Sequence, residues 1–342
     1  MQNKFSSADK LLDSEGRLIE AGWADTALLE YEPRNIKLNR MNMREWDRYI
    51  IVSASGEYAL SMWLADKRST GAVCACFYDI KNNKQYDCFH SAILPAARIC
   101  MSNSIEKGSV VYKNLFCDYM NLITEGDRHL YCKYTNIYGC ELEANLHLGY
   151  IKGDSTVAVA APFNKDASEF CYNVKTTCMP VSGYVTVDSV RYEFNPETDY
   201  AVLDWGRGVW TAQEAKRFVC NGCGDADGKR IGFNIGYGLG DMSKASENAV
   251  FVDGVCHKLG KVFFDIPFND RNEKWTVRSD DKRFEVEILP IYNSDTKHTL
   301  GLKTFSEKVM FGRMSGNVVL DNGDKVIIED MPCFFEESAN KY

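Results

Sequence analysis

The chain has 342 residues, 45% of them hydrophobic and 12% aromatic, with a formal net charge of −8 and a pI near 5.3. This length allows two domains or one large β domain, and the composition excludes a disordered chain. Scattered lysines and arginines argue against nucleic acid or an anionic membrane as the main partner. No apolar run approaches the roughly 20 residues that span a bilayer, and no hydrophobic leader opens the chain, so we expect a cytoplasmic protein without a transmembrane segment.

The thirteen cysteines do not follow a metal-binding or disulfide pattern. Most lie in apolar, strand-like runs, where a free cysteine behaves as a small buried hydrophobe. The one CxxC, formed by Cys220 and Cys223, has no second pair at zinc-ligand spacing and no nearby histidine. The spacing favours reduced cysteines and no metal, with a redox pair as the minor alternative.

An irregular N-terminal arm, residues 1–45, precedes a chain that is dominated by strand-like runs. The first runs recur about every 8 to 14 residues and cover residues 49–53, 58–64, 72–80, 110–112, 129–134, 141–148 and 156–161. Turn signals separate them at residues 81–83, 125–127 and 152–154. Asp253–Gly254 and residues 321–323 are strong hairpin turns, because Asn and Gly tolerate positive φ.

Helical periodicity is weak, and its best candidates are short segments at residues 43–46, 211–217 and 243–248. Evenly spaced strands without long helices indicate an all-β, antiparallel sandwich or barrel. The polar, glycine-containing stretch at residues 211–228 predicts a domain boundary. We therefore expect an arm at 1–45, a first barrel at 46–212 and a second barrel at 213–342.

Several common chemistries lack their motifs. No GxGxxG follows a strand and opens a helix, and no GK[ST] phosphate loop, HExxH or GxSxG is present. The sequence thus argues against nucleotide-driven transfer, zinc proteolysis and α/β-hydrolase chemistry.

The run LDWGRGVW, residues 203–210, packs acid, base and indole groups among glycines. In an extended strand Asp204 and Trp210 share one face, while Trp205 and Arg207 share the other. The glycines predict a bulge that re-aims one set toward a cavity. Asp204 beside indoles would have a raised pKa and act as a proton donor. The alternative is a structural Asp–Arg pair with buried tryptophans.

In the run GFNIGYGLGD, residues 232–241, the residues of the two strand faces alternate more clearly than in LDWGRGVW. Its glycines share one face with Asn234, and Tyr237 lies on the other face, before Asp241 ends the run. A smooth glycine face suits close approach of a flat or long apolar molecule, because no side chain stands in the way. The alternative is a strand that crosses tightly over another strand.

The remaining candidates are polar groups beside strands. Tyr172, Asn173 and Lys175 open one strand, Glu247 and Asn248 precede another, His257 follows a hairpin, and Glu336 lies against aromatics near the C-terminus. For each of them a structural or solvated role is the alternative. We expect Asp204 and Glu336 as catalytic acids, and the predicted ligand-binding residues are Tyr172, Asn173, Lys175, Trp205, Arg207, Trp210, Asn234, Tyr237, Asp241, Glu247, Asn248 and His257.

The chain resembles the bacterial family known as domain of unknown function 2804. The resemblance rests on these runs together with GWADTALLEYEPRNIKLNRMNMREWDRY, FCYNVKTTCMPVSGYV, GFNIGYGLGDMSKASEN, FVDGVCHKLGKV and VMFGRMSGNVVLDNG. More remotely, their order is similar to the AttH and carotenoid hydratase group, with Tyr172, Gly183, Asp204–Trp205–Gly206 and Glu336 at the matching places. That resemblance implies two lipocalin-like, calycin-type barrels and, in some members, acid-catalysed addition of water to an isoprenoid double bond. The hydratase group carries histidines around its aspartate, and this chain has none beside Asp204.

Three functions remain open. The first is an enzyme without cofactor, in which Asp204 or Glu336 protonates an alkene and aromatic rings stabilise the cation. The second is a carrier or sensor of a small hydrophobic molecule, and the third is a structural or interaction module. A carboxylate inside a cavity favours the enzyme, and a large cavity without one favours the carrier. The substrate, the pathway and the oligomeric state stay open.

Overall fold

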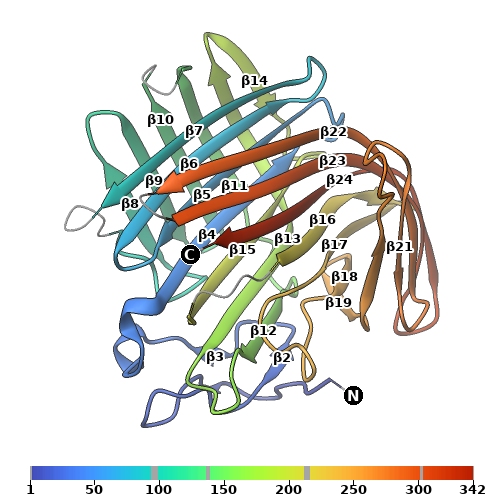
Figure 1. The fold of residues 1–342 in the computed structure, drawn as a ribbon. Coiled ribbons are helices and arrows are strands. Elements are labelled where there is room, and N and C mark those ends of the chain that lie inside the picture. Colours follow the sequence, from blue (N-terminus) through green and yellow to red (C-terminus); the bar gives the residue numbers. More distant parts are fainter. Residues whose placement is uncertain (1, 94–98, 136–138, 212–215, 301–302, 342) are drawn as a thin grey trace.

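The computed structural model describes residues 2–93, 99–135, 139–211, 216–300 and 303–341 (Figure 1). Within these ranges the chain is all-β, with two large antiparallel sheets that follow one another in sequence. The all-β, antiparallel expectation is therefore confirmed. No helix among the described residues has the length and apolar character to cross a membrane.

The first sheet contains thirteen strands. They are β2 (Gly22–Ala24), β4 (Met43–Val52), β5 (Tyr58–Asp66), β6 (Thr70–Asp79), β7 (Lys84–Ile93), β8 (Gly108–Lys113), β9 (Cys117–Thr124), β10 (Asp127–Tyr134), β11 (Leu142–Gly149), β12 (Val157–Pro162), β13 (Phe170–Val187), β14 (Val190–Phe194) and β15 (Tyr200–Val209). Their main order is β7-β6-β5-β4-β15-β13-β11-β10-β9-β8, so the first and last parts of this region meet where β4 pairs with β15.

The second sheet contains nine strands in the order β19-β18-β17-β16-β24-β23-β22-β21-β20. They are β16 (Lys216–Ala226), β17 (Lys229–Tyr237), β18 (Ala249–Val252), β19 (Val255–Lys258), β20 (Val262–Asp265), β21 (Trp275–Ser279), β22 (Phe284–Leu300), β23 (Lys303–Val319) and β24 (Lys325–Lys341). The expected domain boundary between residues 212 and 213 lies outside the described residues.

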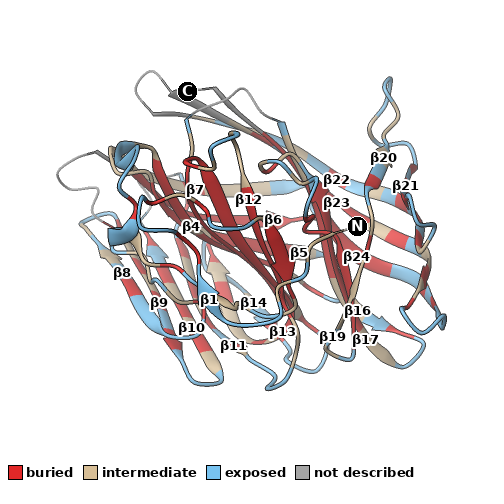
Figure 2. Cartoon of the chain, turned by 90° about the horizontal axis from the view of Figure 1, so that it is seen from below, coloured by how far each residue is buried: buried red, intermediate tan, exposed pale blue. Residues whose placement is uncertain are grey.

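The two sheets pack against each other through the outer face of the first. Strands β5 and β6 are buried almost throughout (Figure 2). Their inward residues, such as Leu60 and Val73, join the core of the first barrel, whereas Cys74 and Tyr78 point outward to Phe311 of the second sheet. The long strands β22–β24 lie across these strands (Figure 1). Burial on both faces explains why alternation of polar and apolar residues is weak in these strands.

The N-terminal arm packs into the first barrel. It contains the short strands β1 (Asp9–Lys10) and β3 (Leu29–Glu30), the 3-10 turns η1 (Pro33–Asn35) and η2 (Arg40–Asn42), and strand β2. Leu11, Leu12, Leu18, Tyr31 and Ile36 are buried in the first core. The irregular arm therefore contributes to the core of the barrel that follows it.

Most predicted strands and turns are observed. The hairpin turns have positive φ at Asp253, Gly254 and Gly323, as expected. The helical prediction at 43–46 is wrong: these residues begin β4, where the run MREWDRYI alternates between two buried faces. The prediction at 243–248 is also wrong, because turns and bends occupy that segment. The candidate at 211–217 lies partly outside the described residues, and β16 begins within it.

The expected bulge at the glycines of LDWGRGVW is also wrong. The pairing of β15 with β4 runs without a register shift from Tyr200 to Val209. The irregularity lies instead in β13, between Thr176 and Met179, where Cys178 has a φ of 53°. Gly206 is needed for a different reason, because a Cβ there would lie 2.0 Å from the Trp46 ring.

Candidate functional site

Three neighbouring strands of the first sheet place a row of charged side chains toward the second sheet. The register pairs Lys175 of β13 with Asp204 of β15, and Asp204 with Arg48 of β4. Side chains directly opposite each other in a sheet lie on the same face. Cation, anion and cation therefore stand next to one another on the outer face of the first barrel.

Two residues of the second half complete a buried charged quartet, which consists of Lys175, Asp204, Arg217 and Glu247. Asp204 Oδ2 lies 2.5 Å from Lys175 Nζ and 3.1 Å from Arg217 Nη2. Glu247 Oε2 lies 3.5 Å from Lys175 Nζ and 3.4 Å from Arg217 Nη2. The side chains of Lys175 and Glu247 are each 1% exposed. Two cations and two anions balance there, which is the condition for burying so many charges.

Asp204 is held as a carboxylate. Its Oδ1 accepts hydrogen bonds from Asn173 Nδ2 at 2.8 Å and from Trp46 Nε1 at 3.0 Å. Burial alone would raise the pKa of this carboxyl, but Arg217, Lys175 and the hydrogen bond from Asn173 outweigh it and hold the pKa well below its usual range. The expected raised pKa is therefore wrong, because the cations were not visible in the local sequence. An ionised Asp204 can stabilise a cation but does not donate a proton.

Glu247 is positioned by two amides that the sequence analysis singled out. Asn234 Nδ2 donates to the carbonyl of Glu247 at 3.0 Å, and the N–H of Gly236 donates to Asn248 Oδ1 at 2.7 Å. Asn248 Nδ2 in turn donates to the carbonyl of Gly260 at 2.9 Å. Asn234 and Asn248 thus fix the loop that carries Glu247 into the quartet.

The glycine face of β17 is filled by protein. A Cβ at Gly232 would lie 2.5 Å from Cys178 Sγ, and one at Gly236 would lie 2.3 Å from the carbonyl of Phe218. The face therefore lies against neighbouring chain, and the expectation that it accommodates a flat guest molecule is not supported by these contacts. The tight strand crossing that was the alternative fits them.

A second cluster lies beside the quartet on the same face of β4. Arg48 forms ion pairs with Glu307 of β23 and Glu336 of β24, and its Nε donates to Ser61 Oγ at 3.2 Å. The guanidinium also lies 5.5 Å from the centre of the Phe334 ring. We call Glu307 and Glu336 the acid pair. Both carboxyl groups are buried, and they share Arg48 as their cation.

The acid pair contains a group that can carry a proton near neutral pH. Burial raises the pKa of Glu307, Arg48 opposes that rise and the neighbouring Glu336 adds to it, which brings the pKa to about 7. Two carboxyls that share a site cannot both ionise easily, because like charges repel. Within this region the acid pair, and not Asp204, supplies a protonated carboxyl.

The quartet, Arg48 and the acid pair form one layer. Trp46 and Arg48 are two residues apart on β4, about 6.6 Å along the strand, and Glu336 contributes to the electrostatic field at Arg217. The layer holds three cations and four carboxyl groups, so its formal charge is −1 with every carboxyl ionised. Glu307 is the member whose protonation removes that excess.

Partly buried aromatic rings border the layer. Trp46 and Trp210 form an edge-to-face pair with 5.8 Å between ring centres, and Trp210 stacks on Phe163 at 4.9 Å. The three rings, which we call the aromatic edge, are only partly buried. The indole that bonds Asp204 therefore belongs to an apolar surface that reaches solvent.

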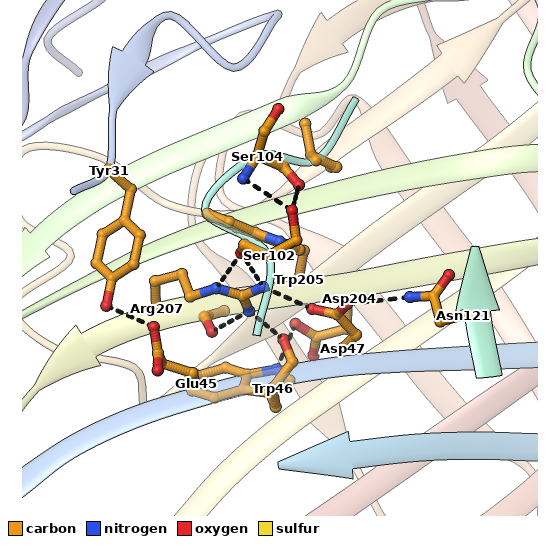
Figure 3. Close-up of polar contacts among 12 residues, drawn as sticks. Tyr31, Glu45, Trp46, Asp47, Ser102, Ser104, Asn121, Asp204, Trp205 and Arg207 are labelled. Atoms are coloured by element: carbon orange, nitrogen blue, oxygen red, sulfur yellow. Dashed lines mark hydrogen bonds and ion pairs between the residues drawn. The ribbon is translucent and has the colours of Figure 1, made fainter. Parts of the chain in front are cut away.

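Trp205 and Arg207 lie on the opposite face, inside the first barrel (Figure 3). Tyr172 pairs with Arg207 in the register and is buried in the same core. Arg207 forms an ion pair with Asp47 at 2.9 Å and donates to the carbonyls of Ser102, Trp46 and Gly206. Its guanidinium lies 4.0 Å from the centre of the Trp205 ring. Tyr172 OH accepts from the N–H of Leu29 at 3.3 Å. In this structure these side chains hold the arm and Ser102 against the inside of the barrel.

Three predicted ligand residues lie away from the layer. Tyr237 is 40% exposed. Asp241 caps a turn by accepting from the N–H of Ser243 at 2.9 Å, and His257 Nδ1 lies 3.2 Å from Asp321 Oδ2. The structure does not bring them together with Asp204 or Glu336.

Sequence reasoning missed Trp46, Arg48, Arg217 and Glu307. The alternation in MREWDRYI was the available signal for the first two, since it places Trp46 and Arg48 on one face. Nothing local marks Arg217 or Glu307, whose partners lie 13 and 259 residues away, at Asp204 and Arg48.

The cysteines are free in the described structure. Cys220 and Cys223 lie on β16 with odd spacing, so they point to opposite faces. Cys220 joins the second core, and Cys223 Sγ accepts a hydrogen bond from the N–H of Cys178 at 3.1 Å. No group of three or more Cys, His, Asp or Glu among the described residues could hold a metal ion.

The fold defines a class of protein, in which two antiparallel lipocalin-like barrels follow one another. Kievitone hydratase from Nectria haematococca is similar in structure, with a TM-score of 0.52 and 11% identity over 88% of this chain and 89% of that one. The putative AttH (NE1406) from Nitrosomonas europaea gives the same TM-score and identity over 88% of this chain and 94% of that one. These similarities confirm the AttH-like, two-barrel fold.

The chain belongs to the family described as "Domain of unknown function (DUF2804)", which matches residues 2–342. This confirms the family resemblance drawn from the motifs. Among curated proteins none matches the sequence.

Proposed function

We propose that this protein binds a small hydrophobic molecule beside the aromatic edge and adds water to it, or isomerises it, by acid catalysis. The observation that carries the proposal is the acid pair. Burial and the neighbouring Glu336 raise the pKa of Glu307 to about 7, so a carboxyl of the acid pair can carry a proton near neutral pH. A general acid works best when its pKa lies near the working pH.

Groups elsewhere in the layer and at its aromatic edge fit the later steps of such a reaction. The protonated carboxyl gives its proton to one carbon of a double bond, and positive charge develops at the other. The faces of Trp46 and Trp210 attract a cation, and the ionised Asp204 lies 3.0 Å from the Trp46 indole nitrogen. Water then attacks the cation, and its proton returns to the carboxylate of the acid pair.

The structural neighbours support this chemistry as a proposal. One of the two is a hydratase, and the fold is shared although the identity is low. Tight packing in the charged quartet favours a role for Lys175, Asp204, Arg217 and Glu247 in electrostatics and in joining the two sheets. We therefore assign proton transfer to the acid pair.

The experiment uses a panel of isoprenoid alkenes and polyenes incubated with the purified protein in H₂¹⁸O. Mass spectrometry detects a product that has gained water with the heavy oxygen, and chromatography detects an isomer of unchanged mass. We expect one class of apolar alkene to be converted by the wild type. Glu336→Gln should lose conversion because it removes one carboxyl of the acid pair.

Glu337→Gln is the matched control. Glu337 is the next residue on β24 but forms ion pairs with Lys216 and Arg271. This variant should convert the substrate at the wild-type rate. Conversion by Glu336→Gln and Glu307→Gln at the wild-type rate would contradict the proposal. Saturable binding without any conversion would favour the carrier instead.

A further inference from the structure

A serine and a lysine meet beside the loop that carries Glu247. Ser246 lies in the loop before β18, and Lys258 is the last residue of β19. The β18–β19 hairpin pairs Ala249 with Lys258, which brings the lysine back to the start of the hairpin. Lys258 Nζ lies 2.9 Å from Ser246 Oγ and 2.8 Å from the carbonyl oxygen of Asn248.

The surroundings of Lys258 favour a neutral amine. Burial lowers its pKa to about 7, although Cys256, Glu247 and Asp281 oppose that shift. No carboxylate in the described part of the chain forms an ion pair with Lys258 Nζ. Lys258 and Lys4 both lie over the Trp23 ring, at 5.4 and 5.0 Å from its centre, and Arg283 donates to the Lys258 carbonyl. A neutral amine in contact with a hydroxyl can act as its base.

The arm covers this pair with an amide. Gln2 Oε1 accepts from the N–H of Ser246 at 2.8 Å and from Ser246 Oγ at 3.2 Å. Gln2 Nε2 donates to the carbonyl of Leu259 at 2.8 Å. The carbonyl oxygen of Gln2 thus contacts a backbone donor and a hydroxyl at once, which is how the carbonyl of an acyl substrate would be held beside a nucleophile.

We propose that Ser246 and Lys258 form a serine–lysine dyad that hydrolyses a carboxylic ester, with Gln2 as a removable cover. When Gln2 is displaced, the hydroxyl turns toward Lys258 Nζ. The oxygen then attacks the ester carbonyl while its proton passes to the amine, and the alcohol leaves with that proton. Water, deprotonated by the same amine, attacks the acyl-serine, releases the acid and restores the hydroxyl. The N–H of Ser246 is the donor available for the carbonyl oxygen.

The test uses the full chain and an alkyl fluorophosphonate, which labels activated serines. Intact mass gives the stoichiometry, and trypsin releases residues 245–258, in which Ser246 is the one serine. We expect single labelling on this peptide in the wild type and its loss in Ser246→Ala. Lys258→Met should label at least about 100-fold more slowly, because general-base assistance contributes 10²–10⁴-fold. Gln2→Ala should label faster than the wild type.

Matched controls establish that labelling depends on Ser246 and Lys258 themselves. Ser243→Ala removes a hydroxyl from the same segment and should label like the wild type. Circular dichroism and thermal unfolding establish that each variant is folded. The labelling rate should rise with pH through about 7, because the amine becomes neutral as its pKa is passed. Equal labelling of Ser246→Ala and the wild type, a wild-type rate in Lys258→Met, or no labelling of the wild type and Gln2→Ala would overturn the proposal.

Discussion

Replacing Glu307 by glutamine should stabilise the protein above neutral pH. Glutamine has the shape of the protonated carboxyl but cannot ionise. The wild-type carboxyl has its pKa raised from 4.5 to about 7 by burial and by Glu336, so folding favours the protonated form. One pKa unit corresponds to about 1.4 kcal/mol, and the rise therefore amounts to about 3 kcal/mol.

The sign follows from this linkage. A raised pKa in the folded state contributes stability below pH 4.5 that is lost as the pH rises through about 7. The unfolding free energies of Glu307→Gln and the wild type should therefore agree near pH 4 and differ by about 3 kcal/mol in favour of the variant at pH 8. Urea unfolding followed by tryptophan fluorescence at several pH values measures this difference.

Glu337→Gln is the control with the opposite sign. Burial raises the pKa of Glu337, but Arg271 and Lys216 lower it by more than burial raises it. The pKa of Glu337 therefore lies below its ordinary value. This variant should be less stable than the wild type at pH 8. A Glu307→Gln protein that is no more stable than the wild type at pH 8 would refute the account of the acid pair.

Two further predictions concern the neighbouring quartet, and one concerns the contact of Gly206 with Trp46. Lys175→Met should destabilise the fold by about 3–5 kcal/mol because it leaves buried carboxylates short of a cation, and adding Asp204→Leu should restore much of that loss. Chemical denaturation of the two single variants and the double variant measures the coupling between the two residues. Losses that simply add in the double variant would contradict this prediction. Gly206→Ala should destabilise the fold by about 1–3 kcal/mol because its Cβ would meet the Trp46 ring. Adding Trp46→Ala should relieve this clash. A melting temperature of Gly206→Ala like that of the wild type would contradict the prediction. Asp204→Asn should make stability less sensitive to acid, since the lowered pKa of Asp204 contributes stability that is lost as pH falls below about 4; unchanged acid unfolding would contradict this.

The strand pattern and the turns were readable from the sequence because they depend on neighbouring residues. Asp253 and Gly254 adopt positive φ in a hairpin whatever the rest of the chain does. Residues 43–46 were misread, since both faces of β4 are buried and its alternation does not appear as apolar against polar. The sequence around Gly236 does not show which part of the chain packs against this glycine. In the structure its close neighbour is the Phe218 carbonyl of another strand.

Part of the candidate site was visible and part was not. The sequence predicts Asn173, Lys175, Asp204 and Glu247 as site residues because they are polar groups beside strands, and the structure brings them together. Their protonation could not be predicted, because it depends on Arg217, which is placed by the second sheet. Glu336 was chosen, but its partner Arg48 lies 288 residues away in the chain. Long-range pairs of this kind have no signal in a single sequence.

The central claim is that the acid pair delivers the proton to a hydrophobic substrate. The most direct measurement is the pH dependence of kcat/KM for a converted alkene in the wild type and in Glu307→Gln. We predict that the wild-type rate falls as the pH rises through about 7, where Glu307 loses its proton, and that Glu307→Gln is at least about 100-fold slower. A rate that rises with pH, or a variant that converts the alkene as fast as the wild type, would contradict the claim.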